Sequence, residues 1–576
     1  MPKSAHRVRA LLVATSVSCA TVLSGAVWAD VPSGAYLAAR SAAANGDFEA
    51  AAENYAAALA RDPSNPEILE NAAISMLALG DVERSAVIAE QLGAIGQRSQ
   101  IGHMALAARA AKTGDFDTLL ARISGDGGIG PLVDGLVRSW SLVGTGDMTA
   151  ALDSFDAVGE ERGLQGFALY HKALALSLVG DLEGADEIFD MPEAGALRQT
   201  RRGAIAHLEV LSQLGRGDDA IAMLDRSFGS DLDPRLRGMR DALAAGEQVS
   251  PTIVTSATDG IAEVFYTIGS ALRNDASEDY TLLYSRVAEY LRADHIDAIL
   301  LSASLLEQME RFELATKAYA KVSPDDPAYH AAELGRAEAL RRAGKPDAAI
   351  EVLQALTKTH GDLPIVHSSL ADALRSQENY AGAVDAYDAA LALYDGEDAR
   401  GQWFIYYARG ISYERLSEWP KAEADFRKAL ELNPDQPQVL NYLGYSLVEK
   451  KIKLDEALDM IERAAAAQPE SGYIIDSLGW VLFRLGRYEE AVGHMERAAE
   501  LMAIDPIVND HLGDVYWAVG RTLEARFQWR RALSFVDYGD ASQEADPDRI
   551  RRKLEVGLDV VLEEEGLPPL RVADDG

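Results

Sequence analysis

The chain has little cysteine: its 576 residues include a single one, Cys19. One thiol cannot form an internal disulfide or a zinc site made of several thiolates. Removal of Cys19 with a leader would also leave the mature chain without a cysteine nucleophile. Stability must therefore come from packed apolar surface, and 48% hydrophobic residues supply that surface.

Long hydrophobic runs are also rare, and the one that is present lies at the start of the chain. Lys3, Arg7 and Arg9 form a basic segment, and an apolar stretch rich in small residues follows it. This layout is typical of a secretory signal peptide, here with a cleavage site after Ala29. It predicts a leader over residues 1–29, a periplasmic mature protein, and no membrane insertion after cleavage.

Two alternatives to a cleaved leader stay open. About 18 apolar residues are just long enough to span a bilayer as an uncleaved anchor helix. A lipid attached to Cys19 is the other alternative, although Ser16 stands where a leucine usually precedes a lipid-modified cysteine. The small residues before Ala29 favour cleavage and soluble export.

Positive charge is scarce, because 55 basic residues face 91 acidic ones and the net charge is −36. A field of this sign repels phosphate backbones and anionic lipid headgroups, which argues against nucleic-acid or membrane-surface partners. It attracts basic proteins or basic peptide segments. Solubility of an alanine-rich helical protein accounts for most of this charge without any partner.

The sequence has no long alternation of apolar and polar residues, and Ala, Leu, Glu and Arg dominate, so an all-α fold is predicted. Near the C-terminus one phrase occurs three times, as Asn441–Tyr445, Asp476–Trp480 and Asp510–Asp514. Its glycines are 35 and 34 residues apart. A period of this length, with Leu-Gly in one helix and small residues in the next, is typical of a helical solenoid.

The N-terminal half repeats with a similar period at its turns. Glycines followed in most cases by aspartate recur at Gly46, Gly80, Gly114, Gly146, Gly180 and Gly215. We expect each glycine to end a helix in the left-handed conformation, which other residues adopt only at a cost. Small and aromatic residues then follow in phase, as in Ala51, Tyr55 and Ala58 after the first of these glycines, or Ala422, Phe426 and Ala429 after Gly410.

These residues resemble the tetratricopeptide repeat family, over about thirteen units from Ser33 to Leu533. The resemblance implies an all-α, right-handed superhelical solenoid of antiparallel helix pairs. We divide the chain into a leader (1–29), an N-terminal array (30–230), degenerate helical repeats that join the arrays (231–292), a C-terminal array (293–535), and a capping helix with a loose tail (536–576). The joining segment is open to a second interpretation as a hinge.

The resemblance places the binding surface on the first helix of each pair, which lines a concave groove. It implies that residues one and four after the repeated glycine point into this groove, whereas Leu447, Leu482 and Tyr516, three after it, belong to the core. The candidate groove residues are Tyr407, Arg415, Tyr445, Asp476, Trp480, Phe483, Arg484, Asp510, Asp514 and Trp517. Aromatic and arginine side chains are the usual anchors of protein interfaces. The alternative is that some of them fill gaps between first helices or lie under the capping helix.

Motifs for catalysis, cofactors and metals are missing or weak. Gly125–Gly130 matches a dinucleotide-binding pattern, but that motif follows a buried strand, and here it lies between predicted helices. His360 and His367, or His494 and His511, have no carboxylate at metal-ligand spacing. Nucleophile-elbow, zincin and P-loop motifs are not found. We therefore expect no enzyme, no cofactor and no metal site.

The predicted function is a periplasmic adaptor that binds other proteins or peptide segments in the groove. The chain also resembles, more weakly, periplasmic repeat adaptors that bring substrates to an envelope protease, so such a protease is one expected partner. Repeat proteins that clamp acidic chaperone tails use lysines at groove positions where this chain has Tyr445 and Asp476, so that ligand class is not expected. The alternatives are a structural scaffold of the cell envelope and an enzyme or nucleotide binder built on Gly125–Gly130.

Overall fold

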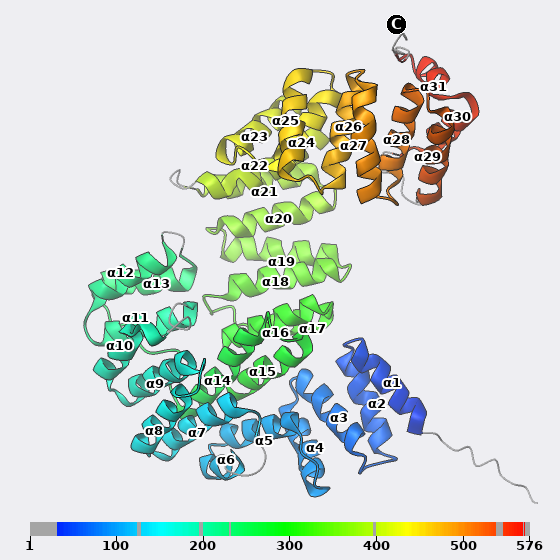
Figure 1. The fold of residues 1–576 in the computed structure, drawn as a ribbon. Helices are drawn as coiled ribbons and strands as arrows, with labels where there is room; N and C mark the ends of the chain where they lie inside the picture. The colour runs from blue at the N-terminus through cyan, green and yellow to red at the C-terminus, as the bar shows by residue number, and fades with distance from the viewer. Residues whose placement is uncertain are drawn as a thin grey trace, which may run out of the picture. The chain divides into compact units, whose positions relative to one another are not determined.

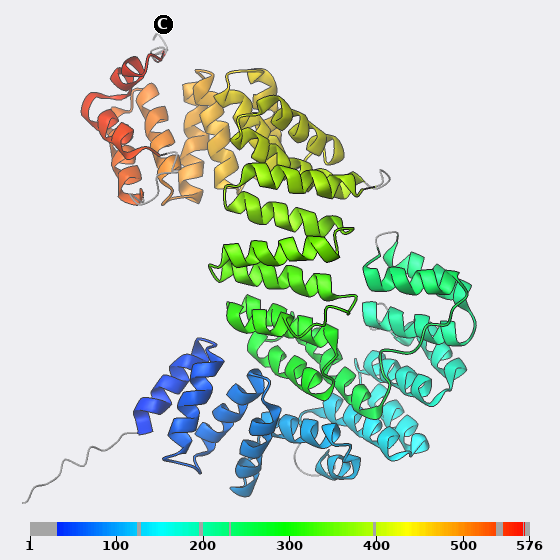
Figure 2. The same cartoon turned by 180° about the vertical axis from the view of Figure 1, so that it is seen from behind.

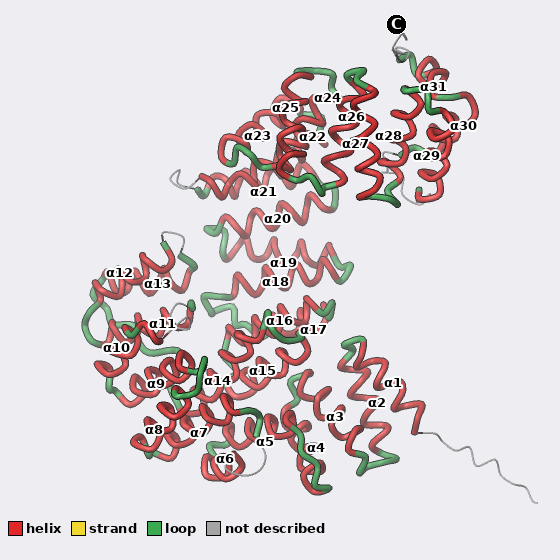
Figure 3. Tube along the Cα trace, in the orientation of Figure 1, coloured by secondary structure: helices red, strands yellow, loops and turns green. Residues whose placement is uncertain are grey.

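The computed structural model describes residues 32–123, 128–194, 200–229, 232–394, 399–536, 545–567 and 570. These ranges consist of helices and connecting loops (Figure 3), and none of their helices has both the length and the apolar character that a membrane crossing requires. The predicted leader, with Cys19, and most of the predicted tail lie outside them. The predicted fold class, an all-α solenoid of antiparallel helix pairs, is confirmed.

The first compact unit extends to Tyr329, beyond the array boundary expected at residue 293. Figure 1 labels its helices, and Figure 2 shows them from behind. They are α1 (Pro32–Ala44), α2 (Phe48–Leu59), α3 (Pro66–Ala78), α4 (Val82–Ala94), α5 (Gln100–Lys112), α6 (Phe116–Ile123), α7 (Pro131–Thr145), α8 (Met148–Gly159), α9 (Gln165–Val179), α10 (Leu182–Asp190), α11 (Arg201–Gln213), α12 (Gly217–Phe228), α13 (Pro234–Ala244), α14 (Ala257–Leu272), α15 (Glu278–Leu291), α16 (Ile296–Gln308) and α17 (Phe312–Tyr319). A short 3-10 helix, Pro192–Ala194, follows α10.

The recurring glycine-aspartate pairs form the turn inside each helix pair. The glycines at 46, 80, 114, 146, 180 and 215 all have positive φ, as predicted. The aspartate that follows caps the next helix: Asp47 accepts a hydrogen bond from the backbone N–H of Ala50, and Asp81 accepts one from Arg84. The pair thus ends one helix and starts the next, because glycine tolerates the left-handed turn and aspartate satisfies a free N–H group.

Helices α14 and α15 cover the first helices of the N-terminal array. α14 contacts α5, α7 and α9, and α15 contacts α3 and α5 (Figures 1 and 2). Gly260 of α14 lies against Trp140 of α7 so closely that a Cβ at this position would be 2.2 Å from the ring. Residues 231–292 are helical, as expected, but α14 and α15 pack across the array they follow.

The second compact unit begins at His330, within α18. Its helices are α18 (Tyr329–Arg342), α19 (Pro346–Thr359), α20 (Pro364–Ser376), α21 (Tyr380–Ala392), α22 (Trp403–Arg415), α23 (Trp419–Leu432), α24 (Pro437–Glu449), α25 (Leu454–Ala467), α26 (Gly472–Arg484), α27 (Tyr488–Leu501), α28 (Pro506–Ala518), α29 (Thr522–Phe535), α30 (Pro547–Val556) and α31 (Leu558–Glu564). A 3-10 helix, Ala399–Gln402, precedes α22, and residues 395–398 lie outside the described ranges.

The repeated glycines of this unit mark where two helices of a pair approach closely. A Cβ at Gly444 would be 2.6 Å from Ile461, and one at Gly513 would be 2.4 Å from the ring of Trp529. A large side chain of the second helix therefore packs directly on the backbone of the first. Beyond the last pair, the predicted capping helix over Asp548–Leu558 is present as α30, which contacts α29.

Candidate functional site

First helices of consecutive pairs form one continuous face of the second unit. Contacts join α20 with α22, α24 with α26, and α26 with α28. This first-helix face is hollowed by a groove of about 320 Å³, here called the α22–α28 groove. Its lining includes four acids (Glu414, Glu449, Asp476 and Asp505), three tyrosines (Tyr442, Tyr445 and Tyr473), Arg415, Lys450, Asn441, Met502, Ile507 and His511.

Three of the candidate residues line the groove: Arg415, Tyr445 and Asp476. Tyr407 is half-buried beside it, with its ring 5.9 Å from that of Tyr442 and 6.1 Å from that of Phe426. The three residues assigned to the core, Leu447, Leu482 and Tyr516, are buried as predicted. The positional rule therefore identifies these three core residues and one groove residue, Tyr445.

Trp480 and Phe483 are not open to a partner, contrary to the expectation. Both are buried, and their rings stack at 4.9 Å. The imidazole of His511, from the next first helix, stacks on Trp480 at 3.9 Å, and Trp480 donates a hydrogen bond to Glu449. Arg484 lies 6.0 Å from the centre of the Trp480 ring. The two aromatic rings fill the gap between consecutive first helices, which was the alternative interpretation.

Asp510, Asp514 and Trp517 lie under the C-terminal cap, so the expectation that they rim an open groove is also wrong. Lys553 of α30 is fully buried, and its Nζ donates to both aspartates at 2.7–2.8 Å. Trp517 donates to Asp559 at 2.8 Å and lies against Gly557 in the turn between α30 and α31. The cap covers the first helix of the last pair, because an exposed apolar end face must be closed.

Carboxylates set the protonation of His511 at the groove wall. Its Nδ1 is 3.1 Å from Asp476, and 11% of its side chain is exposed. Burial lowers the pKa of His511, but Asp476 and the nearby Asp510 and Asp514 more than offset this and raise it above its ordinary value. Burial also raises the pKa of Asp510, although Lys553 opposes that shift. The three carboxylates therefore favour the charged form of the His511 ring.

Asn441 is the groove residue that the candidate set missed. Its side chain is 2% exposed, and its Oδ1 is buried without a hydrogen-bond partner in the described structure. Asn441 lies three residues before Gly444, the position that Asp476 holds before Gly479. Applying to Asn441 the rule used for Asp476 would have identified it. A buried, unpaired oxygen is costly, and a bound donor would satisfy it.

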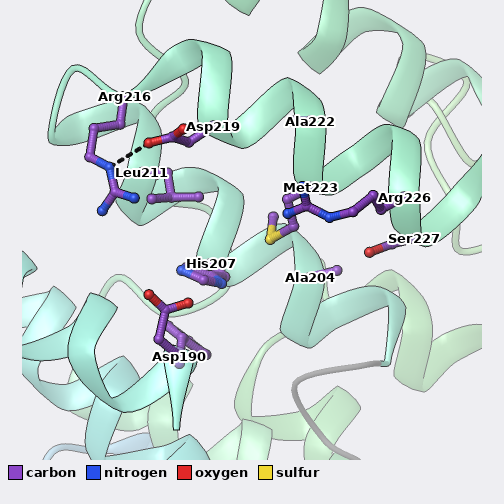
Figure 4. A pocket seen from close by; sticks show the side chains of 11 residues that line it. Asp190, Ala204, His207, Leu211, Arg216, Asp219, Ala222, Met223, Arg226 and Ser227 are labelled. Atoms are coloured by element: carbon purple, nitrogen blue, oxygen red, sulfur yellow. Dashed lines mark hydrogen bonds and ion pairs between the residues drawn. The ribbon is translucent and has the colours of Figure 1, made fainter.

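A second cavity, of about 630 Å³, lies in the first unit beside α10 and α11 (Figure 4). Asp186, Asp190 and His207 place one possible metal-ligand atom each within 4.8 Å of the others. In Figure 4, the side chains of Asp190 and His207 point toward one another. However, Asp186 already accepts from Arg216 and lies 2.8 Å from His207 Nε2. The guanidinium thus neutralises the carboxylate, and we assign this cluster to the ion-pair network that holds α10 to α11.

The glycine-rich segment Gly125–Gly130 does not form a phosphate cradle in its described part, and residues 124–127 lie outside the described ranges. The N–H groups of Ile129 and Gly130 donate to Asp134 at 2.9 and 3.1 Å. A phosphate would need such N–H groups, and here a side chain of the same loop and helix occupies them. Gly130 precedes α7 directly, so the described end of this segment leads into that helix.

A buried ionic network joins α14 to the first helices of the N-terminal array. Glu263 is fully buried and accepts from Arg202 at 2.6 Å and from the hydroxyl of Tyr170 at 2.8 Å. Burial raises the pKa of Glu263, but Arg202 and His295 reverse this and hold it below its ordinary value. Burial lowers the pKa of His171, beside this network, to about 4. These charges fasten α14 to the array, and Arg202 and Tyr170 also line a cavity of about 680 Å³ in the first unit.

Comparison with known proteins finds the same repeat along much of the chain. The tetratricopeptide repeat profile matches residues 36–98, 300–364, 334–398, 403–436 and 453–506. A TPR repeat-containing protein of Pseudomonas aeruginosa is 29% identical over 187 residues, which are 32% of this chain. The chain spans only 30% of the length of that relative.

Solved structures of repeat proteins are similar to the chain at low identity. The crystal structure of the APC/C hetero-tetramer Cut9–Hcn1 is 15% identical, with a TM-score of 0.37, and the match covers 91% of this chain and 96% of that one. A tetratricopeptide repeat protein from Parabacteroides merdae is 17% identical, with a TM-score of 0.36, over 44% of this chain and 96% of that one.

Proposed function

Because the chain is a tetratricopeptide repeat protein, we propose that it is a non-enzymatic adaptor whose α22–α28 groove captures a segment of a partner protein. Repeats of this kind stack into extended surfaces that bind other proteins or peptides. The observation that carries the proposal is that some first helices are covered by other helices of the chain, whereas others border an open groove. α14 and α15 cover α3, α5, α7 and α9, and Lys553 of α30 covers α28, whereas the groove across α22, α24 and α26 is lined by tyrosines and an unpaired buried amide oxygen.

The groove suits binding better than catalysis. His511 and Asp476 form a pair that resembles part of a catalytic triad, but the imidazole lies flat on Trp480. The hydroxyl of the neighbouring Ser477 donates to the backbone oxygen of Tyr473. A nucleophile must be hydrogen-bonded to its base for general-base activation. The tyrosines instead offer apolar area with polar tips, which is the usual composition of a protein-binding surface.

We infer that the adaptor works in the periplasm. Support comes from the basic start, the apolar stretch and the small residues before Ala29. An envelope protein, including a protease, is the partner class this location suggests. N-terminal sequencing of the protein purified from a cell-envelope fraction tests the location. Asp30 as the first residue is the expected result, and an intact Met1 would contradict cleavage.

Affinity capture from an envelope extract tests the groove. The bait is the full mature chain, and the groove variant carries Tyr445→Ala and Tyr473→Ala. Phe527→Ala is the matched control, because Phe527 is 60% exposed on α29, outside the groove. We expect specific partners to bind the wild type and the control and to be lost from the groove variant. Partners retained by all three proteins would instead support the scaffold alternative, in which other surfaces bind.

A further inference from the structure

The chain shows which kind of element its first-helix faces accept, because it covers two of them itself. Each is covered by a helix that brings a buried cation. Arg286 of α15 is 4% exposed, and its guanidinium donates to the backbone oxygen of Ala78, the last residue of α3, at 3.1 Å. Lys553 of α30 is fully buried against α28. These internal helices serve as examples of a bound partner.

Lys553 identifies the positions that receive the cation. It donates to Asp510 and Asp514 at 2.7–2.8 Å. These residues lie three before and one after Gly513. One and two repeats upstream, the corresponding pairs are Asp476 with Trp480, and Asn441 with Tyr445. Three of these four residues, Asn441, Tyr445 and Asp476, line the α22–α28 groove.

The chemistry of the groove also calls for a donor. Oδ1 of Asn441 is buried and accepts no hydrogen bond within the described structure. Glu414, Glu449, Asp476 and Asp505 line the groove, against Arg415, Lys450 and His511, and His511 lies 3.1 Å from Asp476. Lys450 lies over the ring of Trp419 at 4.7 Å and 3.8 Å from Glu414. Acceptors therefore outnumber donors, and an ammonium or guanidinium group complements them.

We propose that the occupant of the α22–α28 groove is a helix of a partner protein that carries a lysine or arginine. The cation donates to Asn441 and Asp476 and lies beside the ring of Tyr445, as Lys553 lies between two aspartates and 5.8 Å from the ring of Trp529. Apolar side chains one turn away on the same helix pack on Tyr473 and Ile507. This inference rests on the proposed function and specifies its ligand.

Three helical host peptides of about 16 residues test whether the α22–α28 groove prefers a positively charged side chain. They carry leucines at i and i+4 and differ only at one guest position, which is lysine, norleucine or glutamate. Norleucine keeps the hydrocarbon stem of lysine without its charge. Binding to the full mature chain is measured by fluorescence anisotropy. We expect the lysine peptide to bind at least tenfold more tightly than the glutamate peptide, with norleucine between them and an advantage that shrinks as salt rises. Equal binding of all three, tighter binding of glutamate, or no binding of the lysine peptide would overturn the proposal.

The variant Asn441→Leu tests the position, with Phe527→Ala as the control. This variant should lower the affinity for the lysine peptide about tenfold. It should change the affinity for the norleucine peptide by no more than about twofold, because only the cation needs the Asn441 oxygen. Thermal unfolding verifies that the variant folds. An equal loss for both peptides, or no loss for either, would contradict the assignment. If no host peptide binds but envelope capture still depends on Tyr445 and Tyr473, the helix-and-cation claim fails and the adaptor function stands.

Discussion

The two units use the same repeat, but their first helices have different neighbours. In the first unit, α14 and α15 lie on α3, α5, α7 and α9, and the contacts are specific: Gly260 fits against Trp140, and Glu263 binds Arg202. In the second unit, the first helices α22, α24 and α26 border a groove, and Asn441 leaves an acceptor unused. The comparison teaches that first helices of this chain can be covered by a helix of the same chain. In the second unit, none of the described helices covers the α22–α28 groove, and we propose that a partner binds there.

The largest expected effect comes from breaking the filled face of the first unit. Arg202→Met leaves the buried carboxylate of Glu263 without the guanidinium that neutralises it. Removing one partner of a buried ion pair costs about 3–5 kcal/mol. Urea denaturation of the full chain, with hydrogen exchange resolved to α9, α11 and α14, measures the loss.

Two controls sharpen this test. Arg240→Met breaks a pair with Asp225 in which both side chains are nearly half exposed, so a change of about 0–1 kcal/mol is expected. The double variant Arg202→Met with Glu263→Met removes both charges of this pair and should recover part of the stability, because Asp297, which also pairs with Arg202, keeps its charge. Equal losses for Arg202→Met and Arg240→Met would mean that the network does not hold α14 in place.

Acidification should affect the two units in opposite directions. In the first unit, burial lowers the pKa of His171 from 6.5 to about 4. Its neutral form therefore adds stability above pH 6.5, and this contribution is lost as the pH falls toward 4. Linkage gives a loss of about 2 kcal/mol between pH 7 and pH 5. In the second unit, the pKa of His511 is raised, so its charged form adds stability at low pH that is lost as the pH rises through that pKa.

Hydrogen exchange at pH 7 and pH 5, corrected for intrinsic rates, separates the two effects. We expect weaker protection in α9 and α14 at pH 5, and protection in α26 and α28 that is unchanged or stronger. His171→Gln removes the titrating group and should flatten the response of α9 and α14. A parallel fall of protection in both units would show that neither histidine governs its surroundings.

The sequence predicts the repeats well because their signals are local. Gly46 and Asp47 adjoin in the chain and form the turn themselves, so the period, the left-handed glycines and the fold class follow from the pattern. The same holds for the buried Leu447 and Leu482, whose directions are set by their place on one helix.

The accessibility of the groove residues could not be predicted in the same way. Trp480 was expected to face the groove, but it is buried, and His511 from the next first helix stacks on it. Asp510 and Asp514 are paired by Lys553, about 40 residues later in the chain. The position of α14 against Trp140 also depends on residues more than 100 positions apart. Such contacts depend on how helices meet in space, which a 34-residue pattern does not encode.

The smallest expected effect, and the most direct comparison, concerns two asparagines in the first helices α24 and α28. Asn441 and Asn509 both have a buried Oδ1 without a partner. The amide nitrogen of Asn509, however, donates to the backbone oxygens of Ala503 and Asp505 at 3.2 and 2.6 Å. Asn441→Leu removes an unsatisfied oxygen and should stabilise the chain by about 1 kcal/mol, whereas Asn509→Leu should destabilise it by about 1–2 kcal/mol.

Urea denaturation measures the change in the free energy of unfolding for each variant. Changes of opposite sign would mean that Asn441 lowers the stability of the chain, which is expected of a residue that serves a bound partner. The second measurement is envelope capture by the same two variants. Asn441→Leu should lose partners although it is the more stable protein, and Asn509→Leu should retain them at temperatures where it is folded. If Asn441→Leu is destabilised as much as Asn509→Leu, its oxygen has an internal role. The contrast between the filled face of the first unit and the receptive face of the second would then lose its main chemical support.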